Sequence, residues 1–308
     1  MPDGSTSLRA SHSGARPFGA AGRGAARAAT DKRKILEASK AYHGSSPWCT
    51  PSPAGVTAED RAHLIEFTYN DIASLEAAAD AAGPDLAGVM VSAFKHDIGI
   101  DLELPTREFA QRVRALCTAK GAALMLDEVR AGYRLHAAGS WEPLGVRPDL
   151  SAWSKAIANG HALAAVAGTD ALRDAATRIF STGSFWAGGV AMAAALATLD
   201  IAEREEPSLI AHLEGMGQRL RQGIAEQAKA HGVKLRQSGP PQMPLILFDD
   251  DPRYEKGIAF CAAALQRGVY LHPRHNMFLS VAHRPQDIDR ALDGTDRAFA
   301  ALARRVER

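Results

Sequence analysis

Two apolar runs in this chain of 308 residues each end on a side chain that can do chemistry. The run Ala123–Leu126 is followed directly by Asp127, and Leu150–Trp153 is followed after one serine by Lys155. In a parallel α/β sheet the carboxyl ends of the strands open onto the ligand crevice, so a side chain just past a strand points toward a bound molecule. Taken alone, Asp127 fits a loop cap equally well, and Lys155 fits a solvated loop lysine.

The acid and the lysine together, 28 residues apart (127 to 155), suit one definite chemistry. A desolvated lysine with a lowered pKa is the nucleophile that Schiff-base chemistry requires. Pyridoxal phosphate needs a lysine for its aldehyde and a carboxylate for its pyridine nitrogen, because the protonated ring is an effective electron sink. The pair therefore favours a pyridoxal 5'-phosphate site.

Composition excludes several other classes of function. The chain has 36 Lys and Arg against 35 Asp and Glu, a formal net charge of +1, and 46% hydrophobic residues. This balance offers no broad attraction for nucleic acid or a membrane surface, and the uncharged stretch 179–199 is too polar in its first half to span a bilayer. Three scattered cysteines predict neither a disulfide framework nor a metal site and fit a cytoplasmic protein with small-molecule substrates.

The elements that must position these side chains begin at Lys34. From there short apolar runs alternate with amphipathic helical patterns, which is typical of an α/β fold with a mainly parallel sheet and flanking helices. Capping residues and Gly121 predict two helices on the outside of this sheet, at Ile72–Ala81 and Arg107–Lys120. We expect strands at Leu64–Phe67, Leu86–Val91, Ala123–Leu126, Leu150–Trp153 and Ala165–Gly168.

The rest of the chain predicts a smaller α+β domain and an unusual start. An Ala-rich helix runs from Gly188 to Glu205, another follows Pro207, and further helices are expected at 254–267 and 285–304. Short strands are expected at 244–248, 269–271 and 277–280. We expect residues 1–30, rich in Ser, Gly, Ala and Arg, to be a disordered or atypical leader, residues 31–231 to form an incomplete cofactor-binding large domain, and residues 232–308 to form the small domain.

Several ordered motifs resemble the class III, fold type I pyridoxal-phosphate aminotransferases, especially the branch similar to glutamate-1-semialdehyde aminomutase. The resemblance runs from about residue 25 to the C-terminus. Its carriers are Tyr42-His43-Gly44, Leu126-Asp127-Glu128-Val129-Arg130-Ala131-Gly132-Tyr133-Arg134, Pro148-Asp149-Leu150 with Ser154-Lys155, Gly183-Ser184-Phe185-Trp186, and the C-terminal Val269-Tyr270-Leu271-His272-Pro273.

The resemblance implies a transaminase that moves an amino group from a donor amine or amino acid to a keto or aldehyde acceptor. Lys155 resembles the lysine that binds the cofactor aldehyde, and Asp127 resembles the partner of the pyridinium nitrogen. Val129 would pack on one face of the ring. The Tyr-His-Gly motif adds Tyr42, whose flat ring would cover the other face, and His43 as a further cofactor-binding residue.

The resemblance also implies a homodimer, because Ser184 matches the hydroxyl that reaches the cofactor phosphate from the neighbouring subunit. Two departures leave alternatives open. The segment 273–277 lacks the glutamate of the aminomutase, which favours a transaminase over an aminomutase-type isomerase. The Gly-rich turn that binds the cofactor phosphate is not found before Tyr42, so we expect an N-terminally truncated chain, with a catalytically impaired, merely dimerising homologue as the other alternative.

Overall fold

The computed structural model describes residues 6–11, 21–44, 46–48, 50–52, 54–180, 188–205 and 207–306. These residues fall into two compact units. Unit 1 takes in the described parts of Met1–Lys95 and Pro105–Arg204, and unit 2 takes in those of His96–Leu104 and Glu205–Arg308. The sequence places a domain boundary near His231, whereas the compact units change at Glu205, because the helix that follows packs on the C-terminal helix of unit 2.

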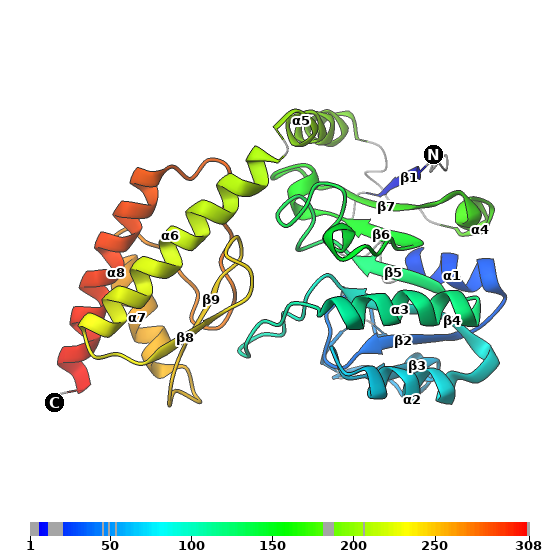
Figure 1. The fold of residues 1–308 in the computed structure, drawn as a ribbon, viewed down its shortest axis with the longest axis horizontal. Coiled ribbons are helices and arrows are strands. Elements are labelled where there is room, and N and C mark those ends of the chain that lie inside the picture. The colour runs from blue at the N-terminus through cyan, green and yellow to red at the C-terminus, as the bar shows by residue number, and fades with distance from the viewer. Residues whose placement is uncertain are drawn as a thin grey trace. The chain divides into compact units, whose positions relative to one another are not determined.

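Unit 1 is built on a seven-stranded sheet in the order β1-β7-β6-β5-β4-β2-β3 (Figure 1). Its strands are β1 (Thr6–Ser11), β2 (Lys34–Ala38), β3 (Leu64–Phe67), β4 (Leu86–Ser92), β5 (Ala123–Asp127), β6 (Leu150–Trp153) and β7 (Ala164–Thr169). Five adjacent strands pair in parallel, namely β6, β5, β4, β2 and β3. Strand β7 pairs antiparallel with both β6 and β1. All seven residues of β4 are buried, as expected for a parallel strand covered on both faces.

Helices cover both faces of this sheet. On one face α2 (Ile72–Ala82) and α3 (Arg107–Lys120) bury an apolar cluster with alternate residues of the strands, among them Leu36, Val89 and Leu124. On the opposite face α1 (Arg23–Thr30) packs with the intervening strand residues, among them Ile35 and Met90, and contacts α4 (Arg173–Arg178). The expectation of an α/β fold with a mainly parallel sheet is confirmed for unit 1.

The helix boundaries follow the capping residues in the sequence. The Asp71 carboxylate accepts a hydrogen bond from Ser74 N at 2.9 Å and starts α2, and the Thr106 hydroxyl accepts one from Phe109 N at 3.1 Å and starts α3. Gly121 ends α3 in the left-handed conformation at φ 57°, where a residue without Cβ is favoured. The expected bounds of α3 agree with the structure residue for residue.

Two described parts of residues 1–30 differ from the expected disordered or atypical leader: β1 pairs antiparallel with β7, and residues 21–30 carry a helix. Helix α1 occupies Arg23–Thr30, and its Ala25 and Ala26 are buried against the sheet. The Ala- and Arg-rich composition shows no wide apolar stripe, but two small alanines suffice where the helix lies close to Gly88, whose added Cβ would come 3.5 Å from Ala26. Composition alone did not predict this helix, because its buried face is narrow.

Unit 2 is a small α+β unit. It holds α6 (Ser208–Ala230), β8 (Leu235–Ser238), β9 (Leu245–Phe248), α7 (Glu255–Leu265) and α8 (Pro285–Val306). The two strands pair antiparallel, and an aromatic group of Phe248, Phe260 and Phe299 joins sheet and helices, with the last two ring centroids 4.5 Å apart. The helix α5 (Gly189–Glu205) ends where unit 2 begins.

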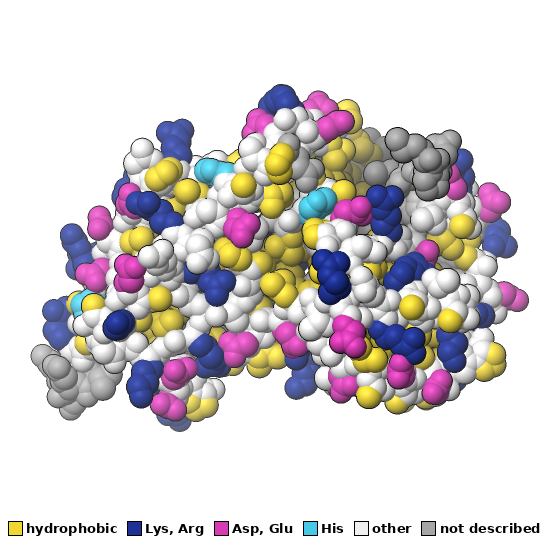
Figure 2. Space-filling view, viewed as in Figure 1, with side chains coloured by type: hydrophobic (Ala, Val, Ile, Leu, Met, Phe, Trp, Pro, Cys, Tyr) yellow, Lys and Arg dark blue, Asp and Glu magenta, His cyan; other side chains and the backbone are white. Residues whose placement is uncertain are grey.

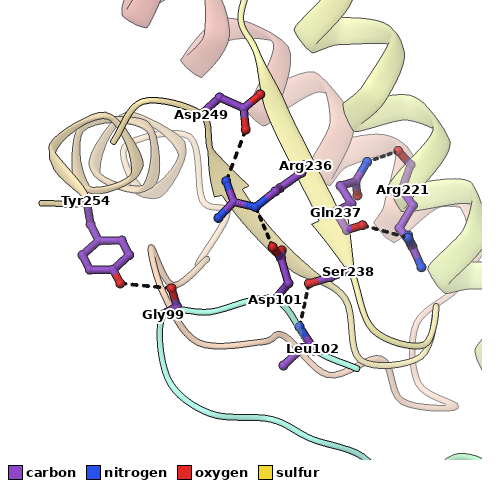
Figure 3. A network of polar contacts seen from close by, with 9 residues as sticks. All are labelled: Gly99, Asp101, Leu102, Arg221, Arg236, Gln237, Ser238, Asp249 and Tyr254. Atoms are coloured by element: carbon purple, nitrogen blue, oxygen red, sulfur yellow. Dashed lines mark hydrogen bonds and ion pairs between the residues drawn. The ribbon is translucent and has the colours of Figure 1, made fainter. Parts of the chain in front are cut away.

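The segment His96–Leu104 belongs to unit 2 through its polar contacts, although β4 and α3 of unit 1 flank it in sequence (Figure 3). Arg236 donates to Asp101 at 2.7 Å and to Asp249 at 3.2 Å, and Leu102 N donates to the hydroxyl of Ser238 at 2.9 Å. The Tyr254 hydroxyl donates to Gly99 O at 3.0 Å. A Cβ at Gly99 would lie 2.2 Å from that hydroxyl oxygen, so the contact requires glycine.

Two expected strands of the C-terminal part, 269–271 and 277–280, are absent from the described fold. Met277 N and Leu279 N do donate to Pro244 O and Gln242 O, each at 2.9 Å. The ladder stops there because Pro244 has no N–H to return. On the face in view in Figure 2 acidic and basic side chains lie interspersed, in keeping with the net charge of +1.

Candidate active site

The carboxylate of Asp127 lies at the carboxyl end of β5, the middle strand of the sheet. Its residue is 7% exposed, and Val129 N donates to its Oδ1 at 2.9 Å. Asp127 pairs in register with Ser92 of β4 and with Ala152 of β6. The fully apolar run before it is buried between the two helical layers, so the acid is the first polar side chain that the strand presents at this edge.

His43 contacts the same carboxylate. Its Nδ1 lies 2.7 Å from Asp127 Oδ2, and both side chains are buried. Burial disfavours the imidazolium, but the hydrogen bond to Asp127 and the negative charges of Glu37 and Asp127 outweigh burial and the nearby Arg23, so the pKa of His43 is raised. The sequence motif predicted His43 as a cofactor-binding residue but did not identify Asp127 as its partner. The two residues are 84 positions apart in the sequence, and the fold brings them together.

Lys155 follows β6 and opens a 3-10 helix at Lys155–Ile157. Its backbone has φ 49°, in the left-handed region that a lysine rarely adopts, and such strain is concentrated at functional sites. The side chain reaches the surface, yet the surrounding atoms desolvate the ammonium enough to lower its pKa. The charges of Arg130 and Arg134 lower it further, while Asp127 acts in the opposite sense.

The structure therefore brings Asp127 and Lys155 to the same edge of unit 1, at the ends of two neighbouring parallel strands, and close enough for their charges to interact. Val129 is buried two residues beyond the aspartate, on the sheet face that α1 covers. Tyr42 is 42% exposed beside the buried His43. Ser184 lies outside the described residues.

A turn rich in arginine and aromatic residues follows Asp127. The rings of Tyr133 and Trp153 lie 4.8 Å apart between centroids, and burial raises the pKa of Tyr133 to about 12. Gly132 makes this turn possible, because its Cβ would lie 2.6 Å from the Trp153 ring. The Arg134 guanidinium donates to the backbone carbonyl of Arg130 at 2.8 Å, and the charges of both arginines act on Lys155.

Glu128 is a second buried carboxylate at this edge, and its partner was not anticipated from the sequence. Ser140 N donates to Oε1 at 2.6 Å and the Ser140 hydroxyl donates to Oε2 at 2.5 Å. Burial raises the pKa of Glu128 to about 7, although the two hydrogen bonds act to lower it. The carboxyl group thus fastens the loop at Ser140 to the strand end.

We expect Glu128→Gln to stabilise the protein at pH 8 but not at pH 5. The folded state binds a proton that the unfolded chain releases between the ordinary pKa of 4.5 and about 7, so wild-type stability falls as the pH rises through this window. Glutamine avoids the loss, which amounts to about 3 kcal/mol. Thermal melting of the unliganded protein from pH 5 to 8 measures the difference. The exposed Glu214→Gln serves as control, and a pH-independent difference for Glu128→Gln contradicts the assignment.

The described part of the chain holds neither a cluster of metal-ligating side chains nor a helix that could span a membrane. No group of three or more His, Cys, Asp or Glu side chains there is arranged to hold a metal ion. No helix within the described ranges has the length and apolar character needed to cross a bilayer.

Known proteins resemble this chain over most of its length. It is 49% identical over 279 residues to the aminopentol aminotransferase of Sphingopyxis macrogoltabida, covering 91% of this chain and 66% of that protein. It is 28% identical over 281 residues to the 3-aminobutyryl-CoA aminotransferase of Cloacimonas acidaminovorans, covering 90% and 67%. The chain thus spans about two thirds of the length of these relatives.

The fold agrees with a solved structure of a related protein. The FumI protein of Sphingopyxis sp. MTA144, in its PLP internal aldimine form, superimposes with a TM-score of 0.94 and 45% identity over 97% of this chain and 72% of that one. This match confirms the expected fold type. The family described as Aminotransferase class-III matches residues 4–286, and the chain belongs to that family.

Proposed function

We propose that this protein is a pyridoxal-phosphate-dependent transaminase that moves an amino group from a donor amine or amino acid to a keto or aldehyde acceptor. The observation that carries the proposal is the placement of Asp127 and Lys155 at the ends of the neighbouring parallel strands β5 and β6, with buried His43 on the aspartate. Family membership and the names of the two relatives support it.

The residues present fit the two reactive ends of this cofactor. A buried carboxylate with a hydrogen-bonded imidazole behind it suits a protonated pyridine nitrogen, and an amine with a lowered pKa suits an aldehyde. In this proposal Asp127 and Lys155 hold the cofactor, Val129 and Tyr42 lie on its two faces, and His43 supports Asp127. Ser184 would bind the phosphate across a homodimer interface.

When bound, pyridoxal phosphate supplies an electron sink for negative charge that develops at the substrate carbon. Asp127 keeps a proton on the ring nitrogen, because its negative charge lies in a buried site where it is weakly screened. Lys155 would hold the cofactor at its aldehyde carbon, and its amine as free base would move a proton to and from the substrate carbon. Its lowered pKa increases the fraction present as free base near neutral pH.

We propose an amine as the donor, and the name of one relative supports this choice. The name of the 49% identical relative, aminopentol aminotransferase, points to an aliphatic amine rather than an α-amino acid as donor. Arg130 and Arg134 provide positive charge beside Lys155, where a carboxylate of the acceptor or donor would be attracted. We also propose a cytoplasmic homodimer in which unit 1 is the cofactor-binding part.

We expect amine-dependent conversion of a keto acid to its amino acid by the purified protein with added pyridoxal phosphate. A panel of aliphatic amines and amino acids with pyruvate as acceptor, followed by chromatography of the alanine formed, measures the transfer. Omitting the keto acid separates the two readings: product formation without any acceptor would indicate an aminomutase-type isomerase. No product from any donor, with the protein folded and the cofactor bound, would contradict the transaminase assignment.

A further inference from the structure

A buried acid that the proposed reaction does not use lies on the same sheet face as Asp127, and its charge acts on His43. Glu37 on β2 is 2% exposed, and its Oε2 has no hydrogen-bond partner among the described residues. An isolated buried carboxylate is costly, and sequence pattern alone would place an apolar residue at this position of a buried parallel strand. Its neighbours in the strand, Leu36 and Ala38, are both buried and apolar.

Glu37 and Asp127 point to the same face of the sheet. Glu37 pairs in register with Met90 of β4, and Met90 pairs with Met125 of β5, two residues before Asp127. Because side chains alternate along a strand, Glu37, Met90, Met125 and Asp127 share the face that α1 covers. Two strand spacings and two residue rises place the Cα atoms of Glu37 and Asp127 roughly 12 Å apart. His43 is hydrogen-bonded to Asp127, and the negative charge of Glu37 also acts on it, so His43 is the group through which the two acids can be coupled.

We propose that Glu37 is a positioning residue that acts through His43 to keep Asp127 charged and aimed at the cofactor ring, forming a buried Glu37–His43–Asp127 relay. This inference rests on the proposed function. In the relay the charges alternate, since a carboxylate on each side favours the imidazolium form of His43, and His43 in turn donates from Nδ1 to Asp127.

The charged groups around Glu37 determine the pH above which Glu37 is charged and the relay is complete. The charges that act on Glu37 are those of His43, of Arg23 in α1, of Arg61 in the 3-10 helix Glu59–Arg61, and of Glu66, its register partner on β3. The pKa of Glu37 is raised to about 7, mainly by burial and also by the charge of Glu66, while His43, Arg23 and Arg61 act to lower it. Below this pH the acid is neutral and resembles a glutamine. Above it the carboxylate is charged and supports the imidazolium.

The test is Glu37→Gln, which keeps the shape of the side chain and removes its charge. With histidine labelled with ¹⁵N, the unliganded protein shows the titration of His43 directly, and a His43→Asn variant assigns its signals among the 11 histidines. We expect Glu37→Gln to lower the pKa of His43 by roughly one pH unit. Glu66→Gln removes the charge of an exposed acid paired in register with Glu37; because Glu66 acts on Glu37 rather than on His43, it should change the pKa of His43 much less than Glu37→Gln does.

Cofactor binding gives a second readout. The dissociation constant of pyridoxal phosphate should rise roughly three- to tenfold in Glu37→Gln at pH 8.5 and by less than about twofold at pH 6, where wild-type Glu37 is itself neutral. A purely structural role for Glu37 predicts the same loss at both pH values and would overturn the proposal. An unchanged His43 titration in Glu37→Gln would overturn it as well.

Wild-type protein alone keeps the inference testable if Glu37→Gln does not fold. The ring-nitrogen shifts of His43 should show an inflection near pH 7 that reports Glu37, and a titration without it contradicts the relay. These NMR measurements need no cofactor. A cofactor label on Lys155 with an unaltered His43 titration would retain the proposed function and reject the relay, and no label would reject the function independently.

Discussion

Lys155→Ala is expected to lose amino transfer almost completely while the protein stays folded and keeps part of its affinity for pyridoxal phosphate. The lysine supplies both the amine that binds the aldehyde and the base that moves the proton. Loss of a positioned base alone typically costs about 10²–10⁴-fold in rate. Because the Lys155 side chain reaches the surface, its truncation leaves no large buried cavity, and the melting temperature should change little.

Steady-state transfer and single-turnover amine conversion measure the effect. Lys155→Arg is the matched control, since it keeps the positive charge near Asp127 but lacks an amine of suitable pKa, and it should be as inactive as the alanine variant. Added methylamine should restore part of the activity of Lys155→Ala by replacing the missing base. Activity within tenfold of wild type in the alanine variant would remove Lys155 from the reaction.

Asp127→Asn is expected to lower kcat/KM by at least about 100-fold, or about 2.7 kcal/mol of transition-state stabilisation, and to weaken cofactor binding. Asparagine keeps the shape and the oxygen that accepts from Val129 N, but it cannot supply the negative charge that holds a proton on the ring nitrogen. The imidazole of His43 also loses its anionic partner, so the pKa of His43 should fall.

The absorbance spectrum of the bound cofactor as a function of pH, together with kcat/KM, measures this change. Asp127→Glu keeps the charge on a longer side chain and should retain more activity than Asp127→Asn. The Asn variant should also lose less unfolding free energy than the 3–5 kcal/mol typical of breaking a buried ion pair, because its amide oxygen still accepts hydrogen bonds. Equal activity of Asn and Glu variants would show that geometry, rather than charge, is what the site requires.

Local sequence signals were sufficient for the elements that carry the chemistry. The apolar run before Asp127 and the capping residues Thr106 and Gly121 can be recognised from a few neighbouring residues. The structure confirms the strand β5 and the helix α3 that they predict. Strand β2 was not expected, because Glu37 interrupts its short apolar run, and a buried charge is recognised only with its neighbours.

Contacts between distant residues could not be read from the sequence. The Glu128–Ser140 and His43–Asp127 hydrogen bonds join residues 12 and 84 positions apart, and neither spacing carries a local signal. The expected strand at 277–280 was wrong for a related reason, since its apolar residues fit a strand but the segment it faces contains Pro244. Whether such a hydrogen bond or strand forms depends on residues far away in the sequence.

The most direct test of the central claim is chemical labelling at Lys155. Purified protein is incubated with pyridoxal phosphate, reduced with borohydride, digested and mapped by mass spectrometry, with Lys155→Ala treated in parallel. We predict one stable cofactor adduct on Lys155 in the wild-type protein and its loss in the variant. A predominant adduct on any other lysine, or no adduct at saturating cofactor, would contradict the assignment of this edge of the sheet as a pyridoxal-phosphate site.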